Sequence, residues 1–154
     1  MSHFIIALSD CILATSHFIL VTELENKEPL PDEYVKAEEV VGLQADNFLP
    51  FLKTKDVTLV MFYQPDCPAC EFSRKHVKKA SKVTIRNRHS YAAVNCEASP
   101  TICCSQKITS TPYFKMYSRG REIGFNDNPR MFTYKDMKHW VEQISVYNGM
   151  GKKM

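Results

Sequence analysis

The stretch that decides the fold of this chain spans residues 57–70 and reads VTLVMFYQPDCPAC. Its first part, Val57–Gln64, is a run of mainly apolar residues rich in β-formers, which predicts a central strand buried on both faces. Its second part places Cys67-Pro68-Ala69-Cys70 after a short turn, at the start of a helix that we expect over Ala69–Val83. A buried strand, a turn and a Cys-x-x-Cys pair that opens a helix together indicate a dithiol redox site.

The two thiols of this motif are not equivalent. Cys67 lies at the expected helix N-terminus, where the backbone dipole favours thiolate over thiol, and it should be the more exposed of the two. Because thiolate is the attacking species in disulfide exchange, we expect Cys67 to be the nucleophile. Cys70 lies one turn further into the helix, so we expect it to be more buried and to resolve the mixed disulfide.

A structural zinc site and an inert or purely binding cysteine pair are the other interpretations of the motif. A tetrahedral zinc site needs two more ligands. Cys103 and Cys104 are adjacent and can hardly occupy two tetrahedral positions, while His76 and His89 each stand alone. The spacing therefore favours redox chemistry, and we expect no bound metal.

Composition limits the class of protein further. A chain of 154 residues is long enough for one domain with a core of its own and a short extension. With 44% apolar and 24% charged residues, it is not a disordered chain. The net charge of +3 is small and its basic segments lack interleaved aromatic residues, so we expect no nucleic-acid partner. Six cysteines favour an oxidising compartment.

The two ends of the chain differ from the middle. Residues 1–22 are largely apolar and contain small residues typical of a signal-peptidase site, so we expect a cleaved signal peptide. An uncleaved anchor, the one case in which we expect membrane contact, and a simple tail are the alternatives. Residues 23–38 are polar and contain prolines, which indicates a linker. A domain over 39–147 and a flexible tail over 148–154 complete the expected organisation.

The remaining patterns predict further elements on either side of residues 57–83. We expect strands over Glu39–Leu43, Tyr91–Asn95, Pro112–Ser118 and Glu122–Phe125, and helices over Asn47–Thr54, capped by Asp46, Pro100–Gln106 and Tyr134–Val146. Within the helix over 69–83, the residues at helical spacing that should form the apolar face are Phe72, His76, Val77 and Ala80. The order β-α-β-α-β-α-β-β-α predicts an α/β fold with a central mixed sheet and helices on both faces.

This arrangement resembles the thioredoxin superfamily over roughly Glu38–Val146. The pattern Phe62-Tyr63-x-Pro65-x-Cys67-x-x-Cys70 is similar to the protein disulfide-isomerase branch of that superfamily. The resemblance implies a thioredoxin fold and a cis peptide bond between Thr111 and Pro112, opposite the dithiol.

Two further features carry the same resemblance. Cys96 and Cys103 have the spacing of a structural disulfide in some isomerase domains, so the resemblance implies that pairing and assigns no role to Cys104. Asp127-Asn128-Pro129-Arg130 resembles an Asp-Gly-Pro-Arg element, whose arginine approaches the active-site cysteines. Arg130 is therefore expected to modulate the dithiol.

The resemblance implies a thiol-disulfide oxidoreductase of the protein disulfide-isomerase type, which acts on cysteines of client proteins through Cys67 and Cys70. Backbone groups of Thr111, beside Pro112, are expected to bind an extended client strand. The resemblance implies no cofactor other than the redox-active Cys67–Cys70 disulfide. The implied partners are cysteine-containing proteins, with glutathione or another oxidoreductase, in the endoplasmic reticulum lumen or outside the cell.

Three positions depart from the family pattern. Met61 replaces a buried acid that assists proton transfer at the second cysteine, Asp66 replaces the usual aromatic residue before the first cysteine, and Ala69 replaces a histidine often found between the two. Asp66 is expected to modulate the dithiol by its charge. Because the acid is absent, a weakly catalytic or non-catalytic substrate-binding module, a chaperone that uses the same groove, is the alternative function.

Overall fold

The computed structural model describes residues 39–149. The expected signal peptide at 1–22, the linker at 23–38 and residues 150–154 of the expected tail lie outside the described residues. The elements follow in the order β1 (Val40–Gly42), α2 (Phe48–Lys53), β2 (Val57–Tyr63), α3 (Pro68–Val83), β3 (His89–Asn95), α4 (Pro100–Ser105), β4 (Tyr113–Ser118), β5 (Arg121–Asn126), the 3-10 helix η1 (Pro129–Met131) and α5 (Tyr134–Gln143).

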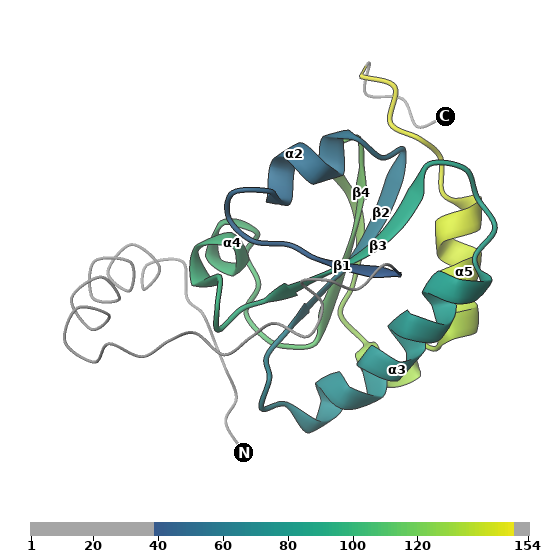
Figure 1. Ribbon diagram of the computed structural model, residues 1–154. Helices are drawn as coiled ribbons and strands as arrows, with labels where there is room; N and C mark the ends of the chain where they lie inside the picture. Colours follow the sequence, from purple (N-terminus) through teal and green to yellow (C-terminus); the bar gives the residue numbers. More distant parts are fainter. Residues whose placement is uncertain (1–38, 150–154) are drawn as a thin grey trace.

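The strands form one mixed sheet in the order β1-β3-β2-β4-β5. β1, β3 and β2 run parallel, whereas β4 is antiparallel to β2 and β5 is antiparallel to β4. α3 and α5 pack on one face of the sheet, and α2 and α4 lie on the other (Figure 1). The expected α/β fold with helices on both faces is confirmed.

β2 is the centre of the core. All seven of its residues are buried, as predicted for a strand covered on both faces. Leu59 and Met61 face the apolar cluster under α3 and α5, while Val60 and Phe62 face the cluster on the opposite side of the sheet. Because successive side chains of a strand point to opposite faces, one short segment joins both halves of the core.

The pairing of β2 with β4 sets the position of the candidate site. β2 ends at Tyr63, and its residue Phe62 is paired with Tyr113, the first residue of β4. The strands are antiparallel, so the chain before β4 lies beside the chain after β2. The register therefore places Thr111 and Pro112 next to the segment that leads into α3.

Several details differ from the sequence-based expectations, and three of them concern α2, α5 and α3. α2 is preceded by Asn47, not Asp46, at its N-cap, and the Asn47 carboxamide accepts a hydrogen bond from the Gln44 N–H instead of capping the helix. α5 ends at Gln143 and not at Val146, and at this end the Arg86 guanidinium donates to the carbonyls of Val141 and Ile144 at 2.6 Å each. These bonds satisfy carbonyls that the helix end leaves unpaired.

The third difference is Phe72. Its ring is 46% exposed, whereas the residues of α3 that face the core are Cys70, Ser73, Val77 and Ala80. His76 is half-buried between Phe72 and Tyr134 and accepts a hydrogen bond from the Tyr134 N–H at 3.0 Å. Phe72 therefore stands on the outer side of α3, close to its first turn.

The β4–β5 hairpin closes through a tight turn at Arg119 and Gly120, where φ is +52° and +91°. Positive φ at both central residues is the geometry that suits the twist of a two-residue hairpin. No helix within residues 39–149 is both long and apolar enough to cross a membrane.

Candidate active site

The site is built at the start of α3. Cys67 is the N-cap residue of the helix, Pro68 occupies its first turn, and Cys67 and Cys70 are joined by a disulfide with a Cα–Cα distance of 5.1 Å. Proline suits this position because N–H groups in the first turn have no acceptor within the helix, so a residue without an N–H loses no hydrogen bond there. The Cys67 sulfur accepts a hydrogen bond from the Cys70 N–H at 3.2 Å. A sulfur thus fills the place that a capping oxygen usually fills, where negative charge is favoured.

The two sulfurs differ in access. Cys70 is fully buried in the cluster under α3 and α5, whereas Cys67 is half-buried at the surface. The sequence predicts this order of exposure, with Cys67 more exposed than Cys70. An external nucleophile can therefore reach Cys67 but not Cys70.

Thr111 and Pro112 lie opposite the disulfide. The peptide bond between them is cis, and the Cys67 sulfur is 3.8 Å from the Thr111 carbonyl oxygen. Pro112 is buried and has no N–H to donate. The backbone polar groups that face the sulfur therefore belong to Thr111. The structure brings together the predicted catalytic pair and the two predicted substrate-binding residues, although 44 residues separate Cys67 from Thr111.

Met61 lies in the same apolar cluster as Cys70. It is fully buried and is paired in register with Ala93 on β3 and Phe114 on β4. The buried polar residues among those described include no aspartate or glutamate. No carboxylate in the core of residues 39–149 therefore takes the place of the acid that Met61 replaces.

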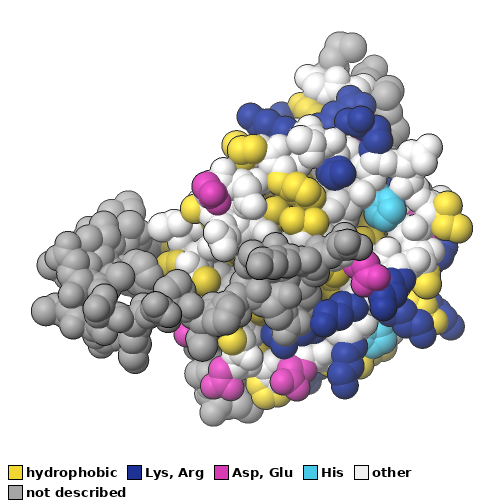
Figure 2. Space-filling view, viewed as in Figure 1, with side chains coloured by type: hydrophobic (Ala, Val, Ile, Leu, Met, Phe, Trp, Pro, Cys, Tyr) yellow, Lys and Arg dark blue, Asp and Glu magenta, His cyan; other side chains and the backbone are white. Residues whose placement is uncertain are grey.

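The charged residues near the dithiol are exposed. Asp66 and Glu71 flank it on the chain, and Ala69 between the cysteines is exposed as well. Figure 2 shows Lys and Arg side chains along α3, with Asp and Glu side chains near the end of the molecule where α3 begins. The surface of the helix is thus basic, whereas its first turn is acidic.

Arg130 belongs to η1, which the sequence did not predict. A small apolar hollow of about 240 Å³ lies between Ala69, Phe72, Pro129 and Arg130. The arginine is therefore brought next to the dithiol segment, and the exposed ring of Phe72 forms part of the same hollow. Phe72 was missed as a site residue because its helical spacing matched the apolar face.

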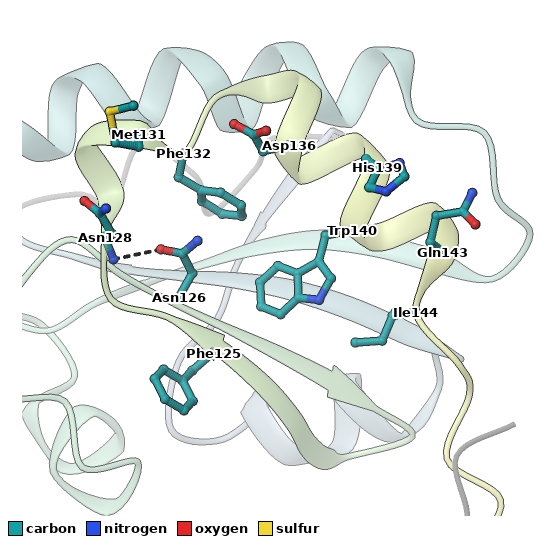
Figure 3. Close-up of a pocket in the computed structure, with 10 residues that line it drawn as sticks. All are labelled: Phe125, Asn126, Asn128, Met131, Phe132, Asp136, His139, Trp140, Gln143 and Ile144. Carbon is teal, nitrogen blue, oxygen red and sulfur yellow. Dashed lines mark hydrogen bonds between the residues drawn. The ribbon is translucent and has the colours of Figure 1, made fainter.

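A larger groove of about 670 Å³ separates β5 and η1 from α5 (Figure 3). Trp140 and Phe132 project into it, and Asp136 and His139 lie along its α5 side. The Trp140 ring packs so closely on Gly124 that a Cβ added there would lie 2.9 Å from the ring. No cysteine among residues 39–149 lines this groove, so it is separate from the dithiol.

Tyr113 follows Pro112 and stacks on Phe125 with ring centroids 6.2 Å apart. Burial raises the pKa of the Tyr113 phenol above its usual value, and the carboxylates of Asp127 and Glu122 raise it further. The phenol is therefore neutral at physiological pH, and the surface beside Pro112 carries an uncharged aromatic pair.

Cys96 and Cys103 form a second disulfide, with a Cα–Cα distance of 5.6 Å. It joins the end of β3 to α4, and both cysteines are fully buried. Within residues 39–149, no group of three or more potential ligand side chains is placed to hold a metal ion.

Removing the second disulfide should cost stability without touching the dithiol. In a Cys96→Ala/Cys103→Ala variant we expect the free energy of unfolding to fall by about 2–3 kcal/mol, because a closed loop of this length restricts the unfolded chain by about that amount. Urea denaturation of both proteins with Cys67 and Cys70 oxidised measures the difference. Equal midpoints and slopes for the two proteins would contradict a stabilising role.

Comparison with known proteins agrees with this geometry. The family model for thioredoxin matches residues 39–142. Among curated proteins, the chain is 31% identical over 132 residues to protein disulfide-isomerase A5 of Mus musculus, which covers 75% of this chain and 26% of that protein. It is 32% identical over 131 residues to the Bos taurus protein of the same name, with 81% and 25% covered.

Solved structures show the same fold. The first thioredoxin domain of mouse protein disulfide-isomerase A4 matches with a TM-score of 0.62 at 16% identity, over 83% of this chain and 95% of that one. Form II of human ERp44 matches with a TM-score of 0.64 at 22% identity, over 75% of this chain and 32% of that one. At these identities the likeness concerns the fold alone.

A mixed sheet with a Cys-x-x-Cys disulfide at the start of α3, opposite a cis-proline, defines a domain of the thioredoxin type. The match over residues 39–142 shows that the chain belongs to the thioredoxin family. The chain spans about a quarter of the length of the two protein disulfide-isomerases A5 that it matches.

Proposed function

We propose that this protein is a thiol-disulfide oxidoreductase of the protein disulfide-isomerase type that acts on cysteines of client proteins. The observation that carries the proposal is the Cys67–Cys70 disulfide at the start of α3, with one sulfur accessible and the other buried. The similarity to protein disulfide-isomerases A5 supports it.

Oxidation of a client takes two exchange steps. A client thiolate attacks the Cys67 sulfur, the Cys67–Cys70 bond breaks, and Cys70 leaves as a thiolate that takes up a proton. A second client thiolate then attacks the client sulfur of the mixed disulfide and releases Cys67. Two electrons pass from the client to the dithiol in this direction, and the same steps in reverse reduce a client disulfide.

The client is expected to bind as an extended segment beside Thr111. The Thr111 carbonyl faces the Cys67 sulfur at 3.8 Å, so a strand paired with Thr111 would bring its own cysteine to the attacked atom. Glutathione or another oxidoreductase would restore the starting redox state, and no cofactor besides the disulfide is required. We place the reaction in the endoplasmic reticulum lumen or outside the cell, where disulfides such as Cys96–Cys103 persist.

A redox titration of Cys67 and Cys70 in glutathione buffers, paired with reduction of insulin and reactivation of scrambled ribonuclease, tests this function. We expect one two-electron transition and measurable turnover with both substrates. Binding of unfolded clients without any turnover would reject the proposal and favour the substrate-binding module. Cys67→Ala/Cys70→Ala protein serves as the matched control.

The charges around the dithiol should set its redox poise. Asp66 and Glu71 oppose a negative sulfur, and Ala69 cannot supply the cation that a histidine would. We therefore expect Asp66→Ala and Ala69→His each to lower the Cys67 pKa and to make the dithiol a stronger oxidant, because a more stable thiolate favours the reduced form.

Thiolate absorbance titration and equilibrium with glutathione measure the two quantities. Glu97→Ala, which removes an exposed carboxylate outside the Cys-x-x-Cys segment, is the control. A Cys67 pKa that Asp66→Ala leaves unchanged would show that solvent screens these charges completely.

A further inference from the structure

Gln64 and Thr111 form a hydrogen-bonded pair beside the Cys67 sulfur. The Thr111 hydroxyl donates to the Gln64 side-chain oxygen at 3.2 Å, and the same hydroxyl lies 3.9 Å from the Cys67 sulfur. All three residues are half-buried. Gln64 comes directly after β2, and Thr111 comes directly before Pro112, so the β2–β4 register brings the two side chains together.

The oxidised state favours donation from the Thr111 hydroxyl to the Gln64 amide oxygen. A hydroxyl has one proton to donate, and a disulfide sulfur is a much weaker acceptor than an amide oxygen. The proton therefore points to Gln64 while Cys67 and Cys70 are bonded. The same hydroxyl also lies within hydrogen-bond distance of the Cys67 sulfur, at 3.9 Å, and the sulfur is the weaker of its two acceptors.

Reduction changes the acceptors available to the hydroxyl. The Cys67 thiolate carries a full charge, and hydrogen bonds to charged groups are the stronger ones. A turn of the hydroxyl directs its proton to the sulfur. The Gln64 amide also contains an NH₂ group. When the amide rotates, this group can donate a hydrogen bond to the Thr111 hydroxyl oxygen.

We propose that Gln64 is a positioning residue that acts on Cys67 through the Thr111 hydroxyl. The amide accepts from Thr111 in the disulfide form and donates to it in the dithiol form, where the hydroxyl in turn donates to the Cys67 thiolate. This inference rests on the proposed function, because it concerns Cys67 as the attacking thiolate.

The other groups around Cys67 make such a contribution useful. The Cys70 N–H already donates to the sulfur at 3.2 Å. Asp66 in the preceding loop and Glu71 on α3 oppose the thiolate, while Arg130 on η1 is a cation next to the dithiol segment. A neutral hydrogen-bond chain can therefore offset part of the repulsion without adding charge to the client surface.

Thr111→Val and Gln64→Leu test the chain of hydrogen bonds. We expect Thr111→Val to raise the Cys67 pKa by about one unit, which is about tenfold less thiolate at a given neutral pH. Gln64→Leu should raise it by about half as much, and it should have no further effect in the Thr111→Val background. The pH dependence of iodoacetamide alkylation of Cys67 in the reduced protein gives each pKa.

Two controls separate this role from a structural one. Gln106→Leu replaces another half-buried glutamine, which accepts a hydrogen bond from the Tyr117 hydroxyl, and should leave the Cys67 pKa unchanged. Thr111→Ser keeps the hydroxyl and should preserve the wild-type pKa, even if Thr111→Val proves too unstable to study. A raised pKa in Thr111→Ser would overturn the proposal.

The remaining outcomes are equally decisive. An unchanged Cys67 pKa in Thr111→Val would also overturn the proposed hydrogen-bond chain. So would a Gln64→Leu shift in the Cys67 pKa that is equally large in the wild-type and Thr111→Val backgrounds. Alkylation requires no client, so the two proposals can fail separately. The expected pKa shifts in a protein that fails to reduce insulin would reject the proposed function and keep the hydrogen-bond chain. Normal turnover without the pKa shifts would reject the hydrogen-bond chain and keep the proposed function.

Discussion

A Cys67→Ser variant is expected to lose disulfide exchange completely, whereas a Cys70→Ser variant should accumulate mixed disulfides with its clients. The reason is the difference in access between the two sulfurs, since Cys67 is half-buried and Cys70 fully buried. A hydroxyl at position 67 cannot form the mixed disulfide. A hydroxyl at position 70 leaves the first step possible but removes the thiol that resolves it.

Reduced and denatured ribonuclease, mixed with each variant in glutathione buffer, provides a direct assay. Trapped adducts are separated on non-reducing gels, and mass spectrometry identifies the bonded cysteine. The Cys67→Ser/Cys70→Ser protein gives the background. Equal alkylation of both thiols in the reduced wild-type protein, with no adducts of Cys70→Ser, would contradict the assignment of roles.

A Met61→Glu variant should exchange disulfides faster than the wild type near neutral pH. Met61 and Cys70 lie in one apolar cluster, in which the described core offers no carboxylate. Burial raises the pKa of a carboxyl in such a place, so the new side chain can hold or release a proton near pH 7. Positioned acid–base groups commonly contribute about 10²–10⁴-fold, and we expect roughly tenfold to a hundredfold because Cys67 stays open to water.

Stopped-flow measurement of the reaction with a reduced client peptide between pH 6 and 8 tests this expectation. Met61→Gln is the matched control, since it has a similar size and polarity but does not titrate. Thermal unfolding of both variants shows what a polar group costs in this core. If Met61→Glu folds but is no faster than Met61→Gln, proton transfer at Cys70 does not limit the rate.

The sequence was most informative where local pattern and tertiary environment agree. The apolar run Val57–Gln64 predicts a strand that β2 matches except for its last residue, because a strand buried on both faces leaves little room for polar residues. The order of the strands and helices follows in the same way. The cysteine pair at the start of α3 was visible because its chemistry depends on three-residue spacing, which is local.

Features that depend on distant residues were less predictable. The carbonyls at the end of α5 are bonded by Arg86, which lies 55 residues before Val141 in sequence. The Gln64–Thr111 hydrogen bond joins residues 47 apart, and neither residue type suggests the other. Phe72 fits the helical spacing of the apolar face, yet the neighbouring Ser73 takes the buried position. Such details require the register of β2 and β4 and the packing of α3 on the sheet.

The buried position of the Cys96–Cys103 disulfide implies an order of events in the life of this chain. Both cysteines are fully enclosed in the folded domain. An oxidant cannot reach thiols that are sealed inside a packed core, so this bond has to form while the chain is still open. The newly made chain must therefore receive this bond from an oxidising system before its core closes.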